Sequence, residues 1–207
     1  MAYGNLKAPG PDGFTAIFFK AAWNVVGEDL QLVIRRCFQT AFVPSFMGLS
    51  KLVIIPKFMN AIKLADFQPI ACCNVVYKVL GKVLVGRLQK VLPSINHPSQ
   101  SGFVKGIRIG DNVLLAHELL HMYNRKHISL RCMIKVDMKK AYDSVDCIFL
   151  EKALLGLHFP VHFVKVIMAY VSSISYSLSI NNVMQPPFRG KMGLDREIHY
   201  LPFCLLL

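Results

Sequence analysis

The first candidate catalytic residue is an aspartate that follows a short apolar run. Asp137 comes directly after residues 131–136, which have the apolar character of a β-strand. A carboxylate at a strand end is held by rigid backbone and stays open to solvent, as divalent-metal catalysis of phosphoryl transfer requires. The structural alternative is an aspartate that caps the next helix or turn. Asp143 fits that alternative better, because it lies just before a helix expected to begin near Asp146.

A second candidate site belongs to a different class of chemistry. The run from His117 to His121 has the HExxH spacing, which puts two histidines on one helix face for zinc and supplies Glu118 as a general base. His127 stands where the extended zinc-protease signature has its third histidine, and Asn124 stands at its glycine position. The arginine and lysine between these two residues would oppose a dication. We therefore interpret this run as the polar surface of a helix and expect no zinc.

Hydrophobic spacing predicts the elements that must position these residues. Apolar residues at helical spacing indicate two amphipathic helices separated at Gly27, a long helix closed by Pro93 and a helix capped by Asp111. Alternating residues before Asn181 and Asn182 indicate a strand and a hairpin. The expected helices are 14–25, 30–41, 75–92, 111–124, 147–157 and 160–172, the expected strands are 52–55, 131–136 and 176–180, and 58–69 is an expected loop. This order predicts an α+β fold, helix-rich with a small, mostly antiparallel sheet.

Composition narrows the class of protein. The 207 residues carry 24 Lys and Arg against 12 Asp and Glu, a formal net charge of +12, yet 54% of the residues are hydrophobic and the mean hydropathy is +0.42. Such a chain must bury a core, which excludes a disordered basic tail. No uncharged apolar run reaches about 18 residues, so we expect no membrane partner. Charge alone does not choose between nucleic acid and other anionic partners.

The cysteines indicate a reducing environment. They lack CxxC spacing, and no secretory signal follows Met1. We therefore expect reduced, mostly buried thiols in a protein that is not secreted. The sequence does not distinguish between the nucleus and the cytoplasm. The six cysteines are Cys37, Cys72, Cys73, Cys132, Cys147 and Cys204.

Short motifs stand in a fixed order along nearly the whole chain. They are Lys7–Phe14, Val53–Lys57, Phe67–Ile70 with Tyr77 and Lys78, Gln100–Gly106, Asp111 with Asn112, and Lys135–Val145. In this order they resemble the reverse transcriptases of LINE-type, non-LTR retrotransposons. The resemblance implies part of a right-hand polymerase, with a fingers-like region at 1–130 and an incomplete palm at 131–194. It also implies an RNA template, a DNA primer and a deoxynucleoside triphosphate as partners.

The resemblance assigns roles to individual residues. Asp137 would bind catalytic Mg²⁺, and the backbone at Met138 would approach the incoming triphosphate. Tyr142 stands where the family distinguishes deoxyribose from ribose, and the alternative is a core tyrosine. Lys57 stands where a lysine of the fingers would neutralise phosphate charge, and the alternative is a solvated charge at a strand end.

Several positions depart from the family's pattern. Gln68 replaces an arginine expected to clasp the triphosphate, and a neutral amide lacks the planar charged fork, so weaker nucleotide binding is expected. Lys105 lies in a run where the family has an arginine directly after the glycine.

The end of the chain departs from the family's pattern in a different way. Codons can be chosen for Asp195–Phe203 such that, when one base is added in front and the reading frame shifts, the same bases encode the family's Arg-Gln-Gly-Asp-Pro-Leu-Ser-Pro-Phe. We therefore interpret residues 195–207 as a tail shifted out of frame by a one-base deletion.

These departures predict a chain that is inactive alone. The sequence ends before the family's Tyr/Phe-Ala-Asp-Asp motif, which supplies the remaining catalytic carboxylates, so the two-metal site would be incomplete. We expect a fragment of an RNA-directed DNA polymerase. The alternative is a nucleic-acid-binding remnant without catalysis.

Basic residues on the expected helix 75–92 leave two interpretations open. Lys78, Lys82 and Arg87 follow helical spacing and would form either a solvated face or, together with Lys105, a set of phosphate contacts. In the second case binding should weaken steeply with salt. The side chains expected to face inward on this helix are Val75, Val79, Val83 and Leu88.

Overall fold

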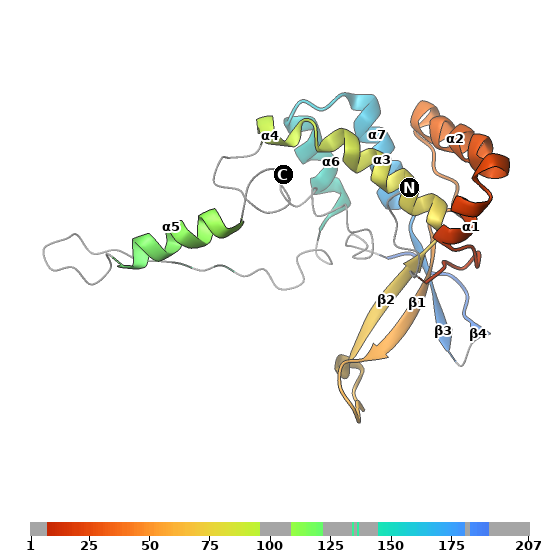
Figure 1. Ribbon diagram of the computed structural model, residues 1–207, viewed down its shortest axis with the longest axis horizontal. Helices are drawn as coiled ribbons and strands as arrows, with labels where there is room; N and C mark the ends of the chain where they lie inside the picture. Colours follow the sequence, from red (N-terminus) through yellow and green to blue (C-terminus); the bar gives the residue numbers. More distant parts are fainter. Residues whose placement is uncertain are drawn as a thin grey trace, which may run out of the picture.

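The computed structural model (Figure 1) describes residues 8–95, 109–121, 134, 136, 145–180 and 183–190 of the chain. Its elements are α1 (Ala16–Ala21), α2 (Trp23–Thr40), β1 (Leu49–Pro56), a short 3₁₀ helix η1 (Leu64–Asp66), β2 (Phe67–Cys73), α3 (Val75–Leu88), α4 (Leu92–Ile95), α5 (Ile109–His121), α6 (Cys147–Gly156), α7 (Val161–Ser172), β3 (Ser175–Ile180) and β4 (Val183–Met184). Within these ranges no helix has the length and apolar character that a membrane crossing needs.

The four described strands form one mixed sheet in the order β2-β1-β3-β4. β1 pairs antiparallel with β2, and β3 pairs antiparallel with β4. The pairing of β1 with β3 is parallel, so the sheet is mixed, and with two of its three described pairings antiparallel it is mostly antiparallel, as expected. This parallel pair joins a strand of the region predicted as fingers to a strand of the region predicted as palm.

Strand β2 corrects the end of the loop expected over residues 58–69, because Phe67, Gln68 and Pro69 belong to the strand. Each residue from Phe67 to Cys73 pairs with a residue of β1. The first half of β2 lacks apolar alternation because it is exposed, and among the described strands it lies at the edge of the sheet, where Pro69 is tolerated. Non-local pairing with β1, and not the local pattern, therefore determines this strand.

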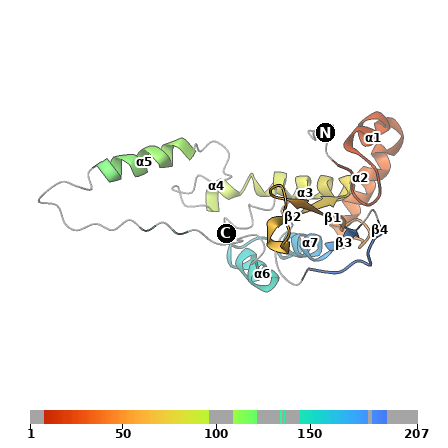
Figure 2. The same ribbon diagram turned by 90° about the horizontal axis from the view of Figure 1, so that it is seen from below.

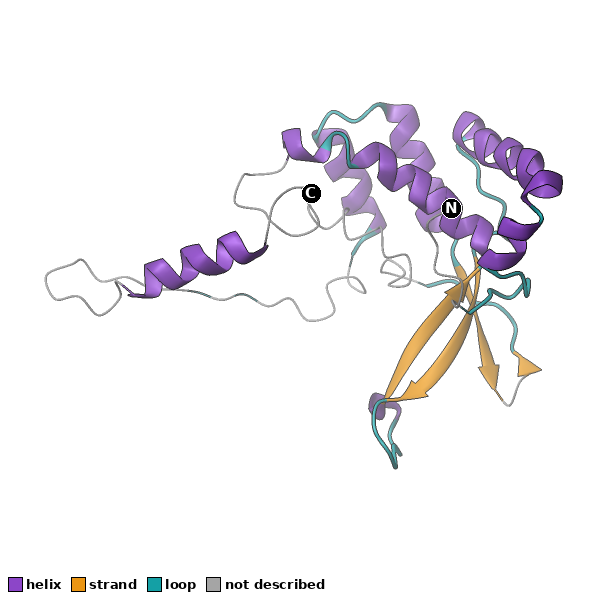
Figure 3. Cartoon of the chain, in the orientation of Figure 1, coloured by secondary structure: helices purple, strands orange, loops and turns teal. Residues whose placement is uncertain are grey.

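The α-helices lie at one end of the sheet, and the hairpin formed by β1 and β2, residues 49–73, extends away from them (Figures 1 and 3). α6 and α7 pack on each other, and α2 contacts α7. Helix α5 stands apart from the other helices in both views (Figures 1 and 2), and its described side chains are exposed or half-buried. The β1–β2 hairpin thus projects from the helices, which hold its base.

Two stacked tyrosines lie at the centre of the core. The rings of Tyr77 on α3 and Tyr170 on α7 are 4.3 Å apart and nearly parallel, and the Tyr77 hydroxyl donates to the Tyr170 carbonyl at 2.7 Å. Leu80 and Leu84 are buried on the same face of α3. The inward face predicted for this helix is confirmed: Val75 and Leu88 are buried, and the half-buried Val79 and Val83 pack against the core on the side that faces α2.

Helix boundaries also differ from those expected. The break between the first two helices falls at Ala22, and α2 runs straight through Gly27, which is buried beneath the ring of Trp23. Asp111 lies in the first turn of α5 and does not cap it, while Pro160 is the N-cap of α7 and not a residue of its first turn. The residue at which a helix begins or ends depends on local backbone geometry, and hydrophobic spacing does not determine it to within one residue.

The strand expected at 131–136 is described at two residues only. Ile134 and Val136 are in no strand and are 78% and 80% exposed. An apolar run becomes a strand only when a partner satisfies its backbone groups, and no partner is described beside these two residues. Asp137 itself lies outside the described residues.

Candidate nucleotide-binding hairpin

The β1–β2 hairpin brings two predicted triphosphate contacts together. Ile55 pairs with Gln68 and Pro56 pairs with Phe67, so Lys57 follows directly at the end of the ladder. Directly opposite residues share a face of an antiparallel pair, and side chains alternate along each strand. Lys57 and Gln68, eleven positions apart in sequence, therefore lie on one face of the hairpin near its tip.

Hydrogen bonds hold the tip of the hairpin in shape. The Lys57 amide donates to the Asp66 carbonyl at 2.9 Å, and the Lys57 ammonium donates to the Ala65 carbonyl at 2.7 Å. The Asp66 carboxylate accepts from the amides of Ile62 and Lys63 at 3.3 and 3.0 Å, which closes the turn. An ammonium group has three donors, so the bond to Ala65 orients Lys57 and leaves donors for an anionic oxygen.

The same face of the hairpin continues to its base, where it meets a small cavity. Lys51, Val53 and Cys72 line a space of about 370 Å³ together with the loop at Pro9–Pro11 and with Met184 of β4. Lys51 pairs with Cys72, and therefore lies on the face that carries Lys57. One hairpin face thus runs from a charged tip to a partly enclosed base beside residues 8–14, the described part of the first motif.

Asn74 fixes the loop at residues 8–14 to the base of the sheet. Its side chain accepts from the Asp12 amide at 3.3 Å and donates to the carbonyls of Phe46 and Met47 at 3.1 and 3.5 Å. Gly10 lies so close to Asn74 that a Cβ on Gly10 would be 2.5 Å from the Asn74 backbone nitrogen. Sequence reasoning missed Asn74, whose partners lie 27, 28 and 62 residues away; the helix start after a polar residue was the only local signal.

The carboxylate of Asp12 is perturbed at this junction. Burial raises the pKa of Asp12 above its ordinary value, while the hydrogen bond from the Phe14 amide and the nearby charge of Lys78 act in the opposite direction. Lys78 is therefore close enough to Asp12 for its charge to act on that carboxylate. It is a half-buried side chain rather than a fully solvated charge.

The other basic residues of α3 have different surroundings. Lys82 is half-buried, and Arg87 is exposed with its guanidinium 4.0 Å from the centre of the Phe38 ring on α2. Such a cation–π contact orients Arg87 between the two helices. Lys105, the fourth predicted nucleic-acid contact, lies outside the described residues.

The predicted catalytic residues lie outside the part of the chain that the structure describes. This holds for Asp137, Met138 and Tyr142. Within that part, no group of three or more His, Cys, Asp or Glu side chains could hold a metal ion. A single carboxylate at Asp137 would be a hard oxygen ligand of the kind Mg²⁺ prefers, but it does not amount to a two-metal site.

The histidines with zinc-protease spacing lie on α5. His117, Glu118 and His121 are exposed. Asn124 and His127, the other two residues of the extended pattern, lie outside the described residues. The described part of this pattern is therefore an exposed helix surface, as expected from the charged residues beside it.

The comparisons with known proteins define the class. The fold is a helix-rich α+β domain with a projecting hairpin, and residues 55–189 match the family described as reverse transcriptase (RNA-dependent DNA polymerase). The chain belongs to this family. The match begins at the hairpin tip and includes both β3 and position 137.

Similar proteins come from retrotransposons. An uncharacterized 149 kDa protein of transposon TX1 from Xenopus laevis is 32% identical over 188 residues, which cover 91% of this chain and 14% of that protein. The Pol polyprotein of the type-2 retrotransposable element R2DM from Drosophila melanogaster is 29% identical over 162 residues, covering 78% of this chain and 15% of the polyprotein. The Pol polyprotein of the type-1 retrotransposable element R1 from Bradysia coprophila is 24% identical over 142 residues, which cover 67% of this chain and 14% of the polyprotein.

The predicted family is confirmed: the chain carries part of a reverse transcriptase domain of the non-LTR retrotransposon type. It spans about a seventh of the length of these relatives.

Proposed function

We propose that this chain supplies the fingers and part of the palm of a right-hand RNA-directed DNA polymerase, and that the β1–β2 hairpin contacts the triphosphate of the incoming nucleotide. The observation that supports this proposal is the shared face of Lys57 and Gln68 at the hairpin tip. A triphosphate carries several negative oxygens, which suit an oriented ammonium and an amide donor. The membership of the chain in the reverse transcriptase family supports the same assignment.

Nucleotide binding tests the proposal without requiring polymerisation. Equilibrium dialysis of dTTP against the 207-residue protein in the presence of Mg²⁺ should give saturable binding, and Lys57→Gln should weaken it about threefold to tenfold, since an exposed charge-assisted contact is lost. Lys165→Gln on α7 is the matched control, because it removes the same charge from an exposed site on a different element. Equal losses in both variants would show that only overall charge matters and would refute the hairpin site.

We propose further that the 207-residue chain does not extend a primer by itself. Asp137 alone does not fit a complete magnesium site, and the described residues contain no further ligand cluster. A primer-extension assay with an RNA template should therefore give no product above a blank without enzyme. Product that is abolished by Asp137→Asn would contradict this proposal, and it would also establish Asp137 as catalytic. A second variant, Tyr142→Ala, would then test ribose discrimination at that position.

Contact with nucleic acid is proposed for Lys78, Lys82, Arg87 and Lys105. The half-buried positions of Lys78 and Lys82 do not favour a purely solvated face. Binding of single-stranded RNA should fall steeply between low and high salt, because neutralised phosphates release counterions. An affinity that stays constant across this range would contradict the assignment.

A further inference from the structure

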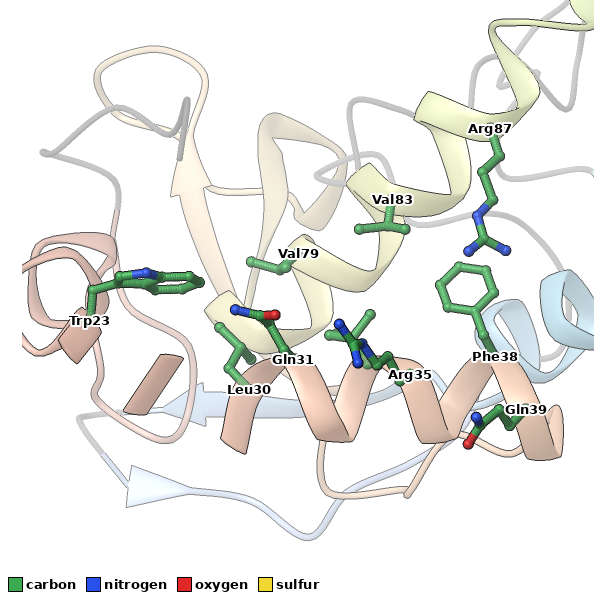
Figure 4. A pocket seen from close by; sticks show the side chains of 10 residues that line it. Trp23, Leu30, Gln31, Arg35, Phe38, Gln39, Val79, Val83 and Arg87 are labelled. Carbon is green, nitrogen blue, oxygen red and sulfur yellow. The ribbon is translucent and has the colours of Figure 1, made fainter. Parts of the chain in front are cut away.

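Helices α2 and α3 enclose a groove of about 390 Å³ that lies away from the hairpin face. Figure 4 shows side chains of both helices directed into it, with Trp23 at one end and Arg87 near the other. The floor is apolar, and the residues that line the groove are Trp23, Leu30, Gln31, Ile34, Arg35, Phe38, Gln39, Val79, Val83 and Arg87. None of these described residues carries a carboxylate.

The indole of Trp23 is held as a flat platform at one end of this groove. Trp23 begins α2, and Gly27 lies one helical turn later beneath its ring. A Cβ on Gly27 would be 3.0 and 3.1 Å from two indole carbons, so the absence of a side chain there lets the ring lie close to the helix. Trp23 nevertheless remains 39% exposed. An exposed aromatic face that is fixed from below can stack with a planar ligand at little entropic cost.

The charges of the groove complement an anion. Arg35 projects from α2 into the groove, and the Arg87 guanidinium lies 4.0 Å above the Phe38 ring, which holds it at the opposite wall (Figure 4). Gln31 and Gln39 add amide groups that can donate or accept hydrogen bonds. The chain as a whole has a net charge of +12. Two guanidinium groups without a lining carboxylate favour a ligand that is both planar and negatively charged.

We propose that this groove binds single-stranded nucleic acid, with a base stacked on Trp23 and flanking phosphates contacted by Arg35 and Arg87. Alternating aromatic faces and cationic groups are the combination that binds single strands without sequence preference. A duplex hides its base faces, so this stacking requires an unpaired strand. The inference deepens the proposed function, because it assumes that the chain contacts nucleic acid, and it adds a contact site that involves none of the hairpin residues.

The tryptophan itself supplies the assay, because Trp23 is the single tryptophan of the chain. An oligodeoxythymidylate of about 12 nucleotides, titrated into the 207-residue protein at about 0.1 M KCl, should quench the Trp23 fluorescence in a saturable way. An oligomer of the same length built from abasic sugars should bind more weakly and leave the emission nearly unchanged. Equal quenching by the abasic oligomer would show phosphate binding without stacking and would overturn the proposal.

Two adjacent arginines provide matched variants. Arg35 and Arg36 are both exposed on α2, but only Arg35 lines the groove. Arg35→Gln should weaken oligonucleotide binding about fivefold in filter retention, whereas Arg36→Gln should stay within about twofold. Trp23→Leu should weaken binding about tenfold by the loss of one stacked base. Equal effects of the two arginine variants would reduce the binding to general electrostatics and refute the groove.

The remaining outcomes separate this inference from the proposed function. Retention of the oligonucleotide on filters without any change at Trp23 refutes the groove but leaves nucleic-acid binding elsewhere intact. Absence of all binding refutes the groove and the nucleic-acid contacts together, while dTTP binding at the hairpin remains a separate measurement. A blue shift of Trp23 emission that grows with protein concentration, and that the oligonucleotide does not reverse, would assign the groove to a second copy of the chain and overturn the proposal.

Discussion

Gly10→Ala tests whether Asn74 holds residues 8–14, the described part of the first motif, against the sheet. An added methyl group would lie 2.5 Å from the Asn74 backbone nitrogen and 2.7 Å from its Cα, and backbone atoms cannot yield as a flexible side chain can. The loop must therefore move away and lose the 3.3 Å hydrogen bond from the Asp12 amide. Overpacking of about 1–3 kcal/mol and one lost hydrogen bond of about 1 kcal/mol give a destabilisation of about 3 kcal/mol.

Urea denaturation followed by far-ultraviolet circular dichroism measures this change. Gly86→Ala is the matched control, because its methyl group meets no atom within 4 Å in the interior of α3. Alanine in place of glycine within a helix should raise the free energy of unfolding by about 1 kcal/mol. The two variants should thus differ by about 4 kcal/mol. A Gly10→Ala protein as stable as the wild type, within about 0.5 kcal/mol, would show that the loop is not held against Asn74 and would refute the reasoning.

Three further predictions concern the core and its ionisable groups. Tyr77→Phe should lower the free energy of unfolding by about 1 kcal/mol, because it removes the hydrogen bond to Tyr170 and keeps the stacked ring; no change in a urea titration would contradict this. Burial raises the pKa of Asp12, so its contribution to stability is complete below its ordinary value of 3.8 and is lost as the pH rises through the folded-state pKa. Asp12→Asn, which keeps an acceptor for the Phe14 amide, should therefore stabilise the protein at pH 7 and have no effect below pH 3.8. Cys37 is 3% exposed and burial raises its pKa, so its thiol should react with a disulfide reagent only after unfolding, as peptide mapping of the labelled protein would detect.

Local patterns predicted the elements whose formation depends on their own residues. The apolar spacing of α3, α6 and α7 and the alternation of β3 gave those elements within a few residues. Motif order gave the family, and the motifs at Val53–Lys57 and Phe67–Ile70 gave the two hairpin residues now found on one face. In each case a short stretch of sequence carries enough information.

Features that depend on distant partners were not predicted. β2 exists because β1 pairs with it, and its first half, which is exposed at Gln68 and Pro69, gives no apolar alternation to detect. Val79 and Val83 were expected to face inward and do so, but no local periodicity encodes that α2 is the helix opposite them. Trp23 and Gly27 carried a signal, an aromatic residue and a glycine one helical turn apart, but the glycine was interpreted as a helix break.

The central claim, that the hairpin face binds a triphosphate, is tested most directly by restoring charge at position 68. Gln68→Arg adds the planar cationic fork beside Lys57, and the affinity for dTTP in equilibrium dialysis should increase about fivefold to tenfold. Gln89→Arg, the same exchange at an exposed site after α3, should leave the affinity within about twofold. Unchanged affinity in Gln68→Arg, or an equal gain in Gln89→Arg, would contradict the assignment of this face to the nucleotide.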